Sequence, residues 1–296
     1  MTKPVIGIIG TGKMGLPMAT NLINAGYSVI AFNRSKASLD QVADLGGTAA
    51  ASIAEVAAGA DIVVSSLTNQ QSVRDVYLGV DGVSSHARDG QIYIETSTND
   101  VALIKEIDEA LTARGAHVLD SPVSGGVPGA VNATLTVMTG GEESVYNRSL
   151  PVLEVLGQNI HHLGSVGAGT AMKLVNQLLV GINMAAVAEA LVLGAQAGAD
   201  PDKILEVIST SFGGSRMLDR GVPLIIDRNF APATPVDLIR KDLGIVVDAA
   251  NENKLPLDIS RAVLSLFDRA HNEGLGENDM TAIVIPLEKD ADLNVS

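Results

Sequence analysis

The first half of the chain alternates short, continuously apolar runs with amphipathic segments. The apolar runs are VIGIIG (5–10), SVIAF (28–32), DIVVSSL (61–67), QIYIE (91–95), HVLD (117–120) and TLTVM (134–138). Segments with helical spacing, such as SLDQVADLG and VALIKEIDEALTARG, lie between them. Continuously apolar strands separated by helices of about 10 to 15 residues are typical of a parallel sheet covered on both faces. The pattern therefore predicts an α/β domain with a doubly wound parallel sheet of the Rossmann type.

The pattern changes after GSVGAG (164–169), where strand-like runs give way to helical ones. We expect a long helix from about Thr170 to Gly198, followed by helices over 201–211, 216–226, 236–252 and 256–273. Near the end, IVIP resembles a strand, and the tail EKDADLNVS is expected to fray. These patterns predict a Rossmann domain over residues 1–165 and an all-helical domain over residues 166–296.

Composition fits a soluble, globular protein. The chain has 296 residues, of which 46% are hydrophobic and 18% charged, enough for two domains with cores of their own. Its longest apolar stretch is interrupted by Asn176, Gln177 and Asn183, and the apolar patch in the first ten residues is too short for a signal peptide. We therefore expect a cytoplasmic protein with no membrane partner.

Charge narrows the possible partners. Acidic residues outnumber basic ones by 34 to 20, for a net charge of −14, which argues against a nucleic-acid partner. Such a protein must bind anions with local devices, such as backbone amides and a few placed Lys or Arg side chains. No metal site is predicted, because the chain has no cysteine and its five histidines, including adjacent His161 and His162, lack ligand spacing.

The first glycine motif is GTGKMG, formed by Gly10, Thr11, Gly12, Lys13, Met14 and Gly15. It follows a predicted strand and opens a predicted helix, which is the setting of a dinucleotide-binding fingerprint. Gly10 permits the tight turn, Gly12 lets the backbone approach a pyrophosphate, and Gly15 allows the helix to pack closely on the sheet. The alternative is an ordinary turn between strand and helix.

The end of the second predicted strand indicates which cofactor is bound. NAD-specific domains usually place an acidic residue there, to hold the ribose hydroxyls. This chain has Asn33, Arg34 and Ser35 instead. Because an Arg can bind a 2′-phosphate with two parallel hydrogen bonds, the segment favours NADP over NAD. The alternative is that Arg34 only stacks on the adenine.

A second glycine motif, DSPVSGGVPGA (120–130), follows the fifth predicted strand at its carboxyl end, where doubly wound sheets bind their ligands. Ser124, Gly125 and Gly126 offer a hydroxyl and two backbone amides, which suit a carboxylate. The alternative is a loop whose glycines serve turn geometry only.

Lys173 stands at the head of an apolar helical stretch, AMKLVNQLLVGINMAA, that contains no other charge. On a helix it shares a polar stripe with Asn176 and Asn183, with Gln177 just to the other side. The lysine either extends outward to solvent or points into a semi-buried cleft. Burial would disfavour its charged form and make it a proton donor and acceptor near neutral pH, as a carbonyl receiving a hydride requires.

Four segments, IGIIGTGKMGLPMATNL, DSPVSGGVPGA, GAGTAMKLVNQ and KDLGIVVDAA, occur in this order across most of the chain. Together they resemble the signature segments of the β-hydroxyacid dehydrogenase family. That family includes 3-hydroxyisobutyrate dehydrogenases and tartronate semialdehyde (2-hydroxy-3-oxopropionate) reductases. The resemblance implies an active site between the domains, a long interdomain helix, and a helical second domain that builds a homodimer or homotetramer.

The resemblance also implies roles for matching residues. Lys173 matches the catalytic lysine and Asn176 an asparagine that orients substrate and lysine, while Gln177 stands where many members have a second Asn. The family's loop for the substrate carboxylate matches Ser124, Gly125 and Gly126.

Contacts to the cofactor are implied in the same way. Lys241, in KDL, matches a lysine near the nicotinamide end of the cofactor, and Leu67, Ser97 and Thr98 fall where members contact the cofactor. Thr68 replaces a usual proline, a change that we expect to be tolerated. Arg216 lies where members vary, and it either reads a distal anionic group on the substrate or is simply solvated.

The resulting interpretation is an NADP(H)-preferring β-hydroxyacid dehydrogenase. It would reduce a small carboxylate semialdehyde, of the tartronate or methylmalonate semialdehyde type, with Lys173 as general acid and base. Two alternatives remain: an imine reductase of the same superfamily, and a catalytically silent NADP-binding module. Lys173 and Ser124 argue against the first, and retention of Lys173 argues against the second.

Overall fold

The computed structural model of the chain describes residues 3–295. The chain divides into two compact units, the first running to Lys173 and the second beginning at Leu174.

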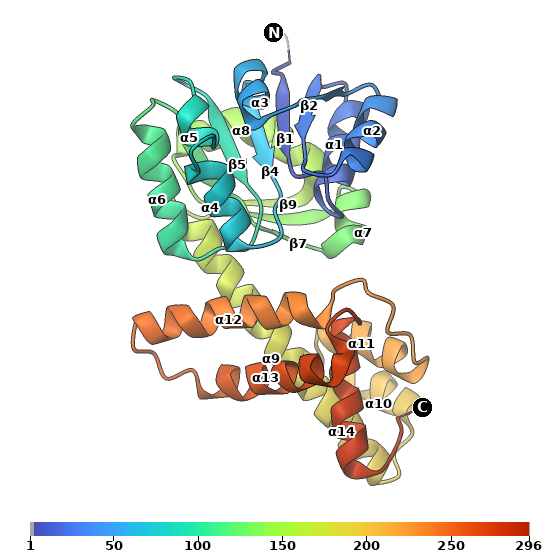
Figure 1. Cartoon of the computed structure of the whole chain (residues 1–296). Coiled ribbons are helices and arrows are strands. Elements are labelled where there is room, and N and C mark those ends of the chain that lie inside the picture. Colours follow the sequence, from blue (N-terminus) through green and yellow to red (C-terminus); the bar gives the residue numbers. More distant parts are fainter. Residues whose placement is uncertain (1–2, 296) are drawn as a thin grey trace. The chain divides into compact units, whose positions relative to one another are not determined.

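A six-stranded parallel sheet forms the centre of the first unit (Figure 1). Its strands are β1 (Ile6–Ile9), β2 (Val29–Phe32), β3 (Thr48–Ala49), β4 (Ile62–Ser65), β5 (Ile92–Glu95) and β6 (His117–Asp120). They lie in the order β3-β2-β1-β4-β5-β6, which is that of a Rossmann sheet. The order reverses at β1, so the loops after β1 and β4 leave the same edge of the sheet side by side. The predicted doubly wound domain is confirmed.

Helices cover both faces of this sheet, because successive strand residues point to opposite sides. Ile6 and Ile8 pack in one cluster with Met18 of α1 (Gly15–Asn24) and with residues of α2 (Lys36–Asp44) and α8 (Glu143–Leu156). Ile9 packs in the opposite cluster with Val56 of α3 (Ile53–Gly59). That cluster also holds residues of α4 (Gln70–Leu78), α5 (Val83–His86) and α6 (Val101–Thr112).

A second, smaller sheet completes the first unit. It contains β7 (Val123–Ser124), β8 (Leu135–Thr139) and β9 (Gly157–His162), with α7 (Gly126–Val131) between the first two strands. The predicted strand TLTVM forms β8, but in this sheet and not in the parallel one. Only Ser121 and Pro122 separate β6 from β7, too few for the crossover that a parallel neighbour needs, so β7 starts a new sheet and pairs antiparallel with β8.

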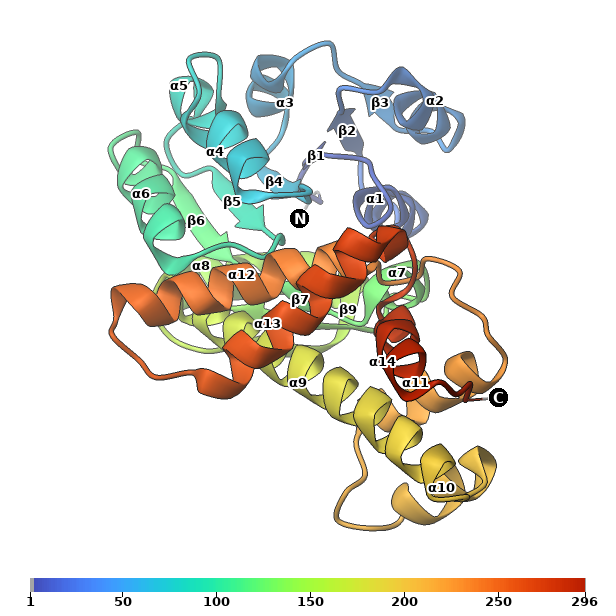
Figure 2. The same cartoon turned by 60° about the horizontal axis from the view of Figure 1, so that its bottom comes forward.

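Helices make up the second unit. They are the continuation of α9 (Ala168–Gln196), then α10 (Pro201–Ile208), α11 (Arg216–Ile226), α12 (Val236–Glu252), α13 (Asp258–Ala270) and α14 (Val284–Ala291). Helices α12 and α13 lie side by side (Figures 1 and 2). The core between the helices includes Met184, Leu191, Leu243 and Phe267, each fully buried. The predicted helical second half is confirmed.

Helix α9 is long and apolar enough to cross a membrane by length and composition alone. Core helices of soluble proteins pass the same test. Here Met184, Ala188 and Leu191 of α9 are buried in the core of the second unit, so part of the apolar surface of α9 serves packing within the protein.

Two expectations for the C-terminal region were wrong. IVIP forms no strand: Ile283 ends a 3-10 helix (Met280–Ile283) and α14 follows at once, with Pro286 in its first turn, where a missing N–H breaks no helical hydrogen bond. The tail does not fray as far as residue 295, because Val295 is buried and its N–H donates to the Glu288 carboxylate at 2.8 Å. Ser296, the last residue of that tail, lies outside the described residues.

Asp279 secures the segment that leads into α12. Its buried carboxylate accepts two hydrogen bonds from the Arg220 guanidinium, at 3.0 and 2.6 Å, and one from the Thr234 N–H at 2.9 Å. Burial alone would raise the pKa of Asp279, but the Arg220 and Thr234 hydrogen bonds, together with the Arg220 charge, outweigh it and hold the pKa below its ordinary value.

We therefore predict that Asp279→Asn lowers the free energy of unfolding by about 3 kcal/mol at neutral pH, since it breaks a buried ion pair. Because the folded-state pKa is lowered, the contribution of Asp279 is fully present above its unfolded pKa, near 3.8, and is lost as pH falls through the folded value. Urea denaturation at several pH values tests both points. Below about pH 4 the free energy of unfolding of the wild type should fall more steeply with decreasing pH than that of the variant. Parallel pH dependences of the two proteins would contradict the lowered pKa of Asp279.

Candidate functional site

The glycine loop after β1 has the geometry of a dinucleotide-binding turn. Gly10 has φ +93°, and a Cβ there would lie 2.2 Å from the Ser66 carbonyl oxygen. A Cβ at Gly15 would lie 1.8 Å from the Gly10 carbonyl oxygen. The fold itself therefore requires both glycines, whereas a Cβ at Gly12 would have no atom within 4 Å. Packing does not explain Gly12, so its position fits the close approach of a ligand.

Hydrogen bonds join the glycine loop to the loop after β2. The Thr11 and Ser38 hydroxyls lie 2.6 Å apart, and the Asn33 side-chain amide donates to the Ser38 hydroxyl at 2.9 Å and to the Ser35 carbonyl at 3.3 Å. Asn33 thus shapes the loop. Arg34 is exposed directly after it, so the end of β2 presents a cation where NAD-binding domains have a carboxylate.

A buried polar network holds the loops after β4 and β5 together. The Leu67 N–H donates to the Ser97 hydroxyl at 2.8 Å, and the Ser97 N–H donates to the Glu95 carboxylate at 2.7 Å. Burial raises the pKa of Glu95, and hydrogen bonds from Ser65, Ser97 and Asn99 oppose that rise. Sequence reasoning missed Glu95, although a glutamate that ends the continuously apolar run QIYIE was a visible signal. Thr68 and Thr98 lie in the same two loops.

The structure brings Lys173 to the second glycine motif. The lysine is 7% exposed, and its ammonium donates to the Val123 carbonyl at 2.7 Å. Val123 and Ser124 form β7, and Gly125 and Gly126 follow with φ +129° and +61°, values that favour glycine. Of the two orientations considered for Lys173, the structure shows the inward one. Lysine, serine hydroxyl and glycine loop all belong to the first unit.

Asp120 fixes the start of the helix that carries Lys173. Its buried carboxylate accepts from the Gly167 N–H at 2.8 Å and the Thr170 N–H at 2.7 Å, which caps α9. Burial raises the pKa of Asp120, and these two backbone hydrogen bonds oppose the rise. Gly169 packs so closely that a Cβ would lie 2.2 Å from the Met138 carbonyl oxygen. Sequence reasoning did not assign Asp120, although it opens the DSPVSGG motif.

The other candidate residues lie in the second unit and form a network of their own. Asn176 donates to the Gln177 side-chain oxygen at 2.8 Å, and Gln177 donates to the Asp242 carboxylate at 2.5 Å. Lys241 forms an ion pair with Asp242 at 3.0 Å. Arg216 is exposed at the first residue of α11, and the suggestion that it reads a distal anionic group on the substrate stays a prediction.

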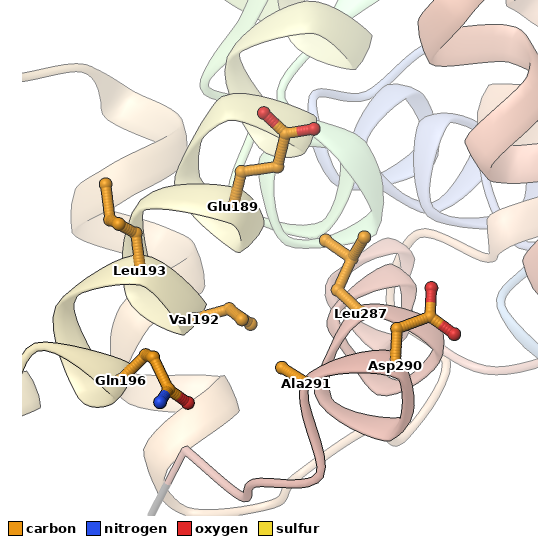
Figure 3. Close-up of a pocket in the computed structure, with 7 residues that line it drawn as sticks. All are labelled: Glu189, Val192, Leu193, Gln196, Leu287, Asp290 and Ala291. Carbon is orange, nitrogen blue, oxygen red and sulfur yellow. The ribbon is translucent and has the colours of Figure 1, made fainter.

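A separate hollow of about 360 Å³ lies in the second unit between α9 and α14 (Figure 3). Its lining combines apolar side chains such as Leu193 and Leu287 with two carboxylates, Glu189 and Asp290. It contains none of the predicted site residues. The Gln196 amide also lines it, and the Asp290 carboxylate is paired with Arg269 at 2.5 Å. Because no predicted site residue lines this hollow, it is not the candidate site.

The residues around β1, β2 and β7 suit a dinucleotide cofactor and a small carboxylate. Glycines at the switch point of a parallel sheet, a cation at the end of β2 and a lysine beside a serine–glycine loop are compatible with hydride transfer from a dinucleotide cofactor to a carbonyl. No group of three or more His, Asp or Glu side chains within residues 3–295 has the arrangement to hold a metal ion. Fold and site together define a dehydrogenase of the Rossmann class.

Comparison with known proteins narrows this class. Residues 5–164 match the NAD-binding domain of 6-phosphogluconate dehydrogenase, and residues 167–287 match the NAD-binding domain of NADP-dependent 3-hydroxyisobutyrate dehydrogenase. The chain is 38% identical to 2-(hydroxymethyl)glutarate dehydrogenase of Eubacterium barkeri, with 98% of this chain and 97% of that protein aligned. It is 36% identical to L-threonate dehydrogenase of Cupriavidus necator, with 94% of each aligned.

A solved structure supports the same placement. Mycobacterium tuberculosis 3-hydroxyisobutyrate dehydrogenase, solved with L-serine, is 30% identical and superposes with a TM-score of 0.90, covering 97% of this chain and 99% of that one. The chain belongs to the β-hydroxyacid dehydrogenase family. It is an NAD(P)-dependent oxidoreductase that acts on CH–OH groups.

The cap by Asp120 generates a prediction about the candidate site. Asp120→Asn replaces one carboxylate oxygen with an NH₂ group, which cannot accept a hydrogen bond. One of the two bonds, from Gly167 or from Thr170, is therefore lost, and we expect the free energy of unfolding to fall by about 1 to 3 kcal/mol. Hydrogen exchange should also speed up at the Gly167 and Thr170 amides and in the first turn of α9. The matched variant Asp108→Asn, on α6, should leave exchange in α9 unchanged. Unaltered exchange in the Asp120 variant would refute the anchoring role.

Proposed function

We propose that this protein is an NADP(H)-preferring reductase of small carboxylate semialdehydes, of the tartronate or methylmalonate semialdehyde type. The observation that supports the proposal is the hydrogen bond from Lys173 to the Val123 carbonyl, since Val123 directly precedes Ser124 in β7. A proton donor beside a carboxylate-binding loop suits a substrate whose carbonyl lies close to a carboxylate. The related dehydrogenases named above act on several different substrates. The choice of a semialdehyde therefore rests on the chemistry of the site residues and not on these relatives.

In the proposed mechanism, the substrate carboxylate binds the Ser124 hydroxyl and the backbone amides of Gly125 and Gly126. The nicotinamide cofactor, when bound, supplies the hydride that reduces the aldehyde carbon. Lys173 donates a proton to the aldehyde oxygen, so that the product is an alcohol, and in the reverse direction it accepts that proton. Asn176, one helical turn after Lys173, orients the lysine and the substrate oxygen, and Gln177 supports substrate binding.

The proposed cofactor site is built from the loops at one edge of the parallel sheet. The segment from Gly10 to Gly15, with Thr11, Lys13 and Met14, would hold the pyrophosphate at the start of α1. Asn33 and Ser35 shape the loop from which Arg34 would bind the 2′-phosphate, which favours NADP over NAD. The remaining proposed cofactor contacts are Leu67, Thr68, Ser97 and Thr98 in the loops after β4 and β5, and Lys241 on α12 in the second unit.

The proposal extends to the roles of the two domains and to the oligomeric state. Residues 1–165 would bind the cofactor, and residues 166–296 would contribute to substrate binding and form a homodimer or homotetramer in the cytoplasm. Apolar side chains on α9 support an oligomer, since Leu193 is 72% exposed and Leu179 50% exposed. The reduction of an imine does not need a carboxylate-binding loop beside a lysine, so this pair of features disfavours an imine reductase. A catalytically silent module would not need Lys173 to be buried at the Val123 carbonyl.

Lys173→Ala tests the proposed acid and base. The variant should bind NADPH with unchanged affinity, but its kcat should fall by about 10² to 10⁴, the usual contribution of a general acid. Lys173→Arg should be nearly as slow, because arginine keeps the charge but does not release its proton at neutral pH. Lys105→Ala, an exposed lysine on α6, is the control. Wild-type turnover in either Lys173 variant would remove the assigned role.

Arg34→Asp tests the cofactor preference. Loss of a charged hydrogen-bond donor and gain of a carboxylate should lower kcat/KM for NADPH by about tenfold to a hundredfold. The value for NADH should be unchanged or higher, since aspartate can hold the ribose hydroxyls. Arg114→Asp, which makes the same charge change after α6, should not alter the ratio of the two cofactors. An equal loss with both cofactors would show that Arg34 does not read the 2′-phosphate.

A further inference from the structure

Four side chains of the second unit form a continuous polar chain on α9 and α12. It runs from Asn176 to Gln177 at 2.8 Å, from Gln177 to the carboxylate oxygen Oδ2 of Asp242 at 2.5 Å, and from Oδ1 of Asp242 to Lys241 at 3.0 Å. The geometry of the last contact is that of an ion pair and not of a hydrogen bond. Gln177 and Asp242 are 6% and 2% exposed, so water competes little for these contacts.

The carboxylate determines the direction of this chain. An ionised carboxylate accepts hydrogen bonds and donates none, so Gln177 must turn its NH₂ group toward Asp242. Its amide oxygen then faces Asn176 and accepts from the Asn176 NH₂ group. That contact leaves the Asn176 amide oxygen on the opposite side of the side chain, as an acceptor. Two amides that could each flip are thus held in one orientation by a single buried acid.

We propose that Asp242 is a positioning residue that orients the Asn176 amide through Gln177. The inference rests on the function proposed above, in which Asn176 orients Lys173 and the substrate oxygen. An acceptor oxygen on Asn176 suits both partners, because an ammonium and a hydroxyl can each donate to it. With the amide reversed, Asn176 would offer an NH₂ group in place of that oxygen, and an ammonium cannot donate to it. Asp242 therefore acts on the reaction without touching the substrate.

The identity of residue 177 matters to the same chain. Gln177 has to reach Asp242 with one end of its amide and Asn176 with the other. A glutamate there would meet Asp242 with like charge, and an apolar residue would end the chain. Asp242 thus affects Asn176 only while an amide stands between them, and that condition makes the proposal testable by coupling.

The test is a double-mutant cycle on kcat with Asp242→Asn and Asn176→Ala. An asparagine at 242 can donate as well as accept, so it no longer fixes the direction, and we expect kcat to fall about tenfold to a hundredfold, as when a reacting group is misplaced by about 1 Å. In the Asn176→Ala background the same change should alter kcat less than about twofold, since the group on which Asp242 acts is gone. Gln177→Met should lower kcat by a similar factor, because it ends the chain between Asp242 and Asn176. It serves as a second variant if Asp242→Asn does not fold.

Two further readouts separate this role from others. If Asp242 acted through Lys241 on the cofactor, Asp242→Asn would raise the Kd for NADPH. The variant would also still lower kcat in the Asn176→Ala background. Either result would overturn the proposal. The side-chain amide resonances of Asn176, assigned from their loss in the alanine variant, should shift in Asp242→Asn but not in the control Asp248→Asn, an exposed acid on α12. Because this measurement needs no substrate, unshifted resonances refute the inference, whereas absent turnover in the wild type refutes the proposed function.

Discussion

The hydrogen bond from the Lys173 ammonium to the Val123 carbonyl is the contact on which the proposed chemistry depends. Burial of a lysine on an apolar helix is costly unless a hydrogen-bond acceptor is available to its ammonium. Here the acceptor is the backbone of β7, the strand that leads into the serine–glycine loop. Asp120 caps the same helix from the other end of the DSPVSGG segment. One short segment therefore holds the lysine, anchors its helix and contains the loop proposed to bind the substrate carboxylate.

The rest of the first unit meets a related constraint, which is to bind an anionic cofactor with a chain of net charge −14. The proposed devices are local ones: glycines that admit close approach, amides at the start of α1 and the exposed side chains of Lys13 and Arg34. The acids near this edge are occupied in holding the loops. Glu95, for example, accepts a hydrogen bond from the Ser97 N–H and so fixes the loop after β5. Buried carboxylates here fix the backbone, and the exposed cations are left for the proposed contacts to phosphate.

Much of this arrangement could be predicted from the sequence, because the signals were local. GTGKMG after an apolar strand indicated the turn, and the apolar runs indicated every long strand of the parallel sheet. Strands β3 and β7 escaped notice because two-residue strands carry no periodicity. Strand β9 was also missed, because its sequence GQNIHH contains a single apolar side chain and no apolar run. IVIP was misread because a short apolar run does not distinguish strand from buried helix. Asp242 was missed for another reason: its role comes from a contact with Gln177, far away in sequence.

The most direct test of the account is the loss of NADPH absorbance at saturating cofactor, measured with a panel of candidate substrates. The panel contains tartronate, methylmalonate and succinate semialdehydes, glyoxylate and a cyclic imine. The account predicts turnover of at least one of the first two semialdehydes, with NADPH preferred over NADH. Turnover of the imine alone, or no turnover at all despite tight NADPH binding, would contradict it.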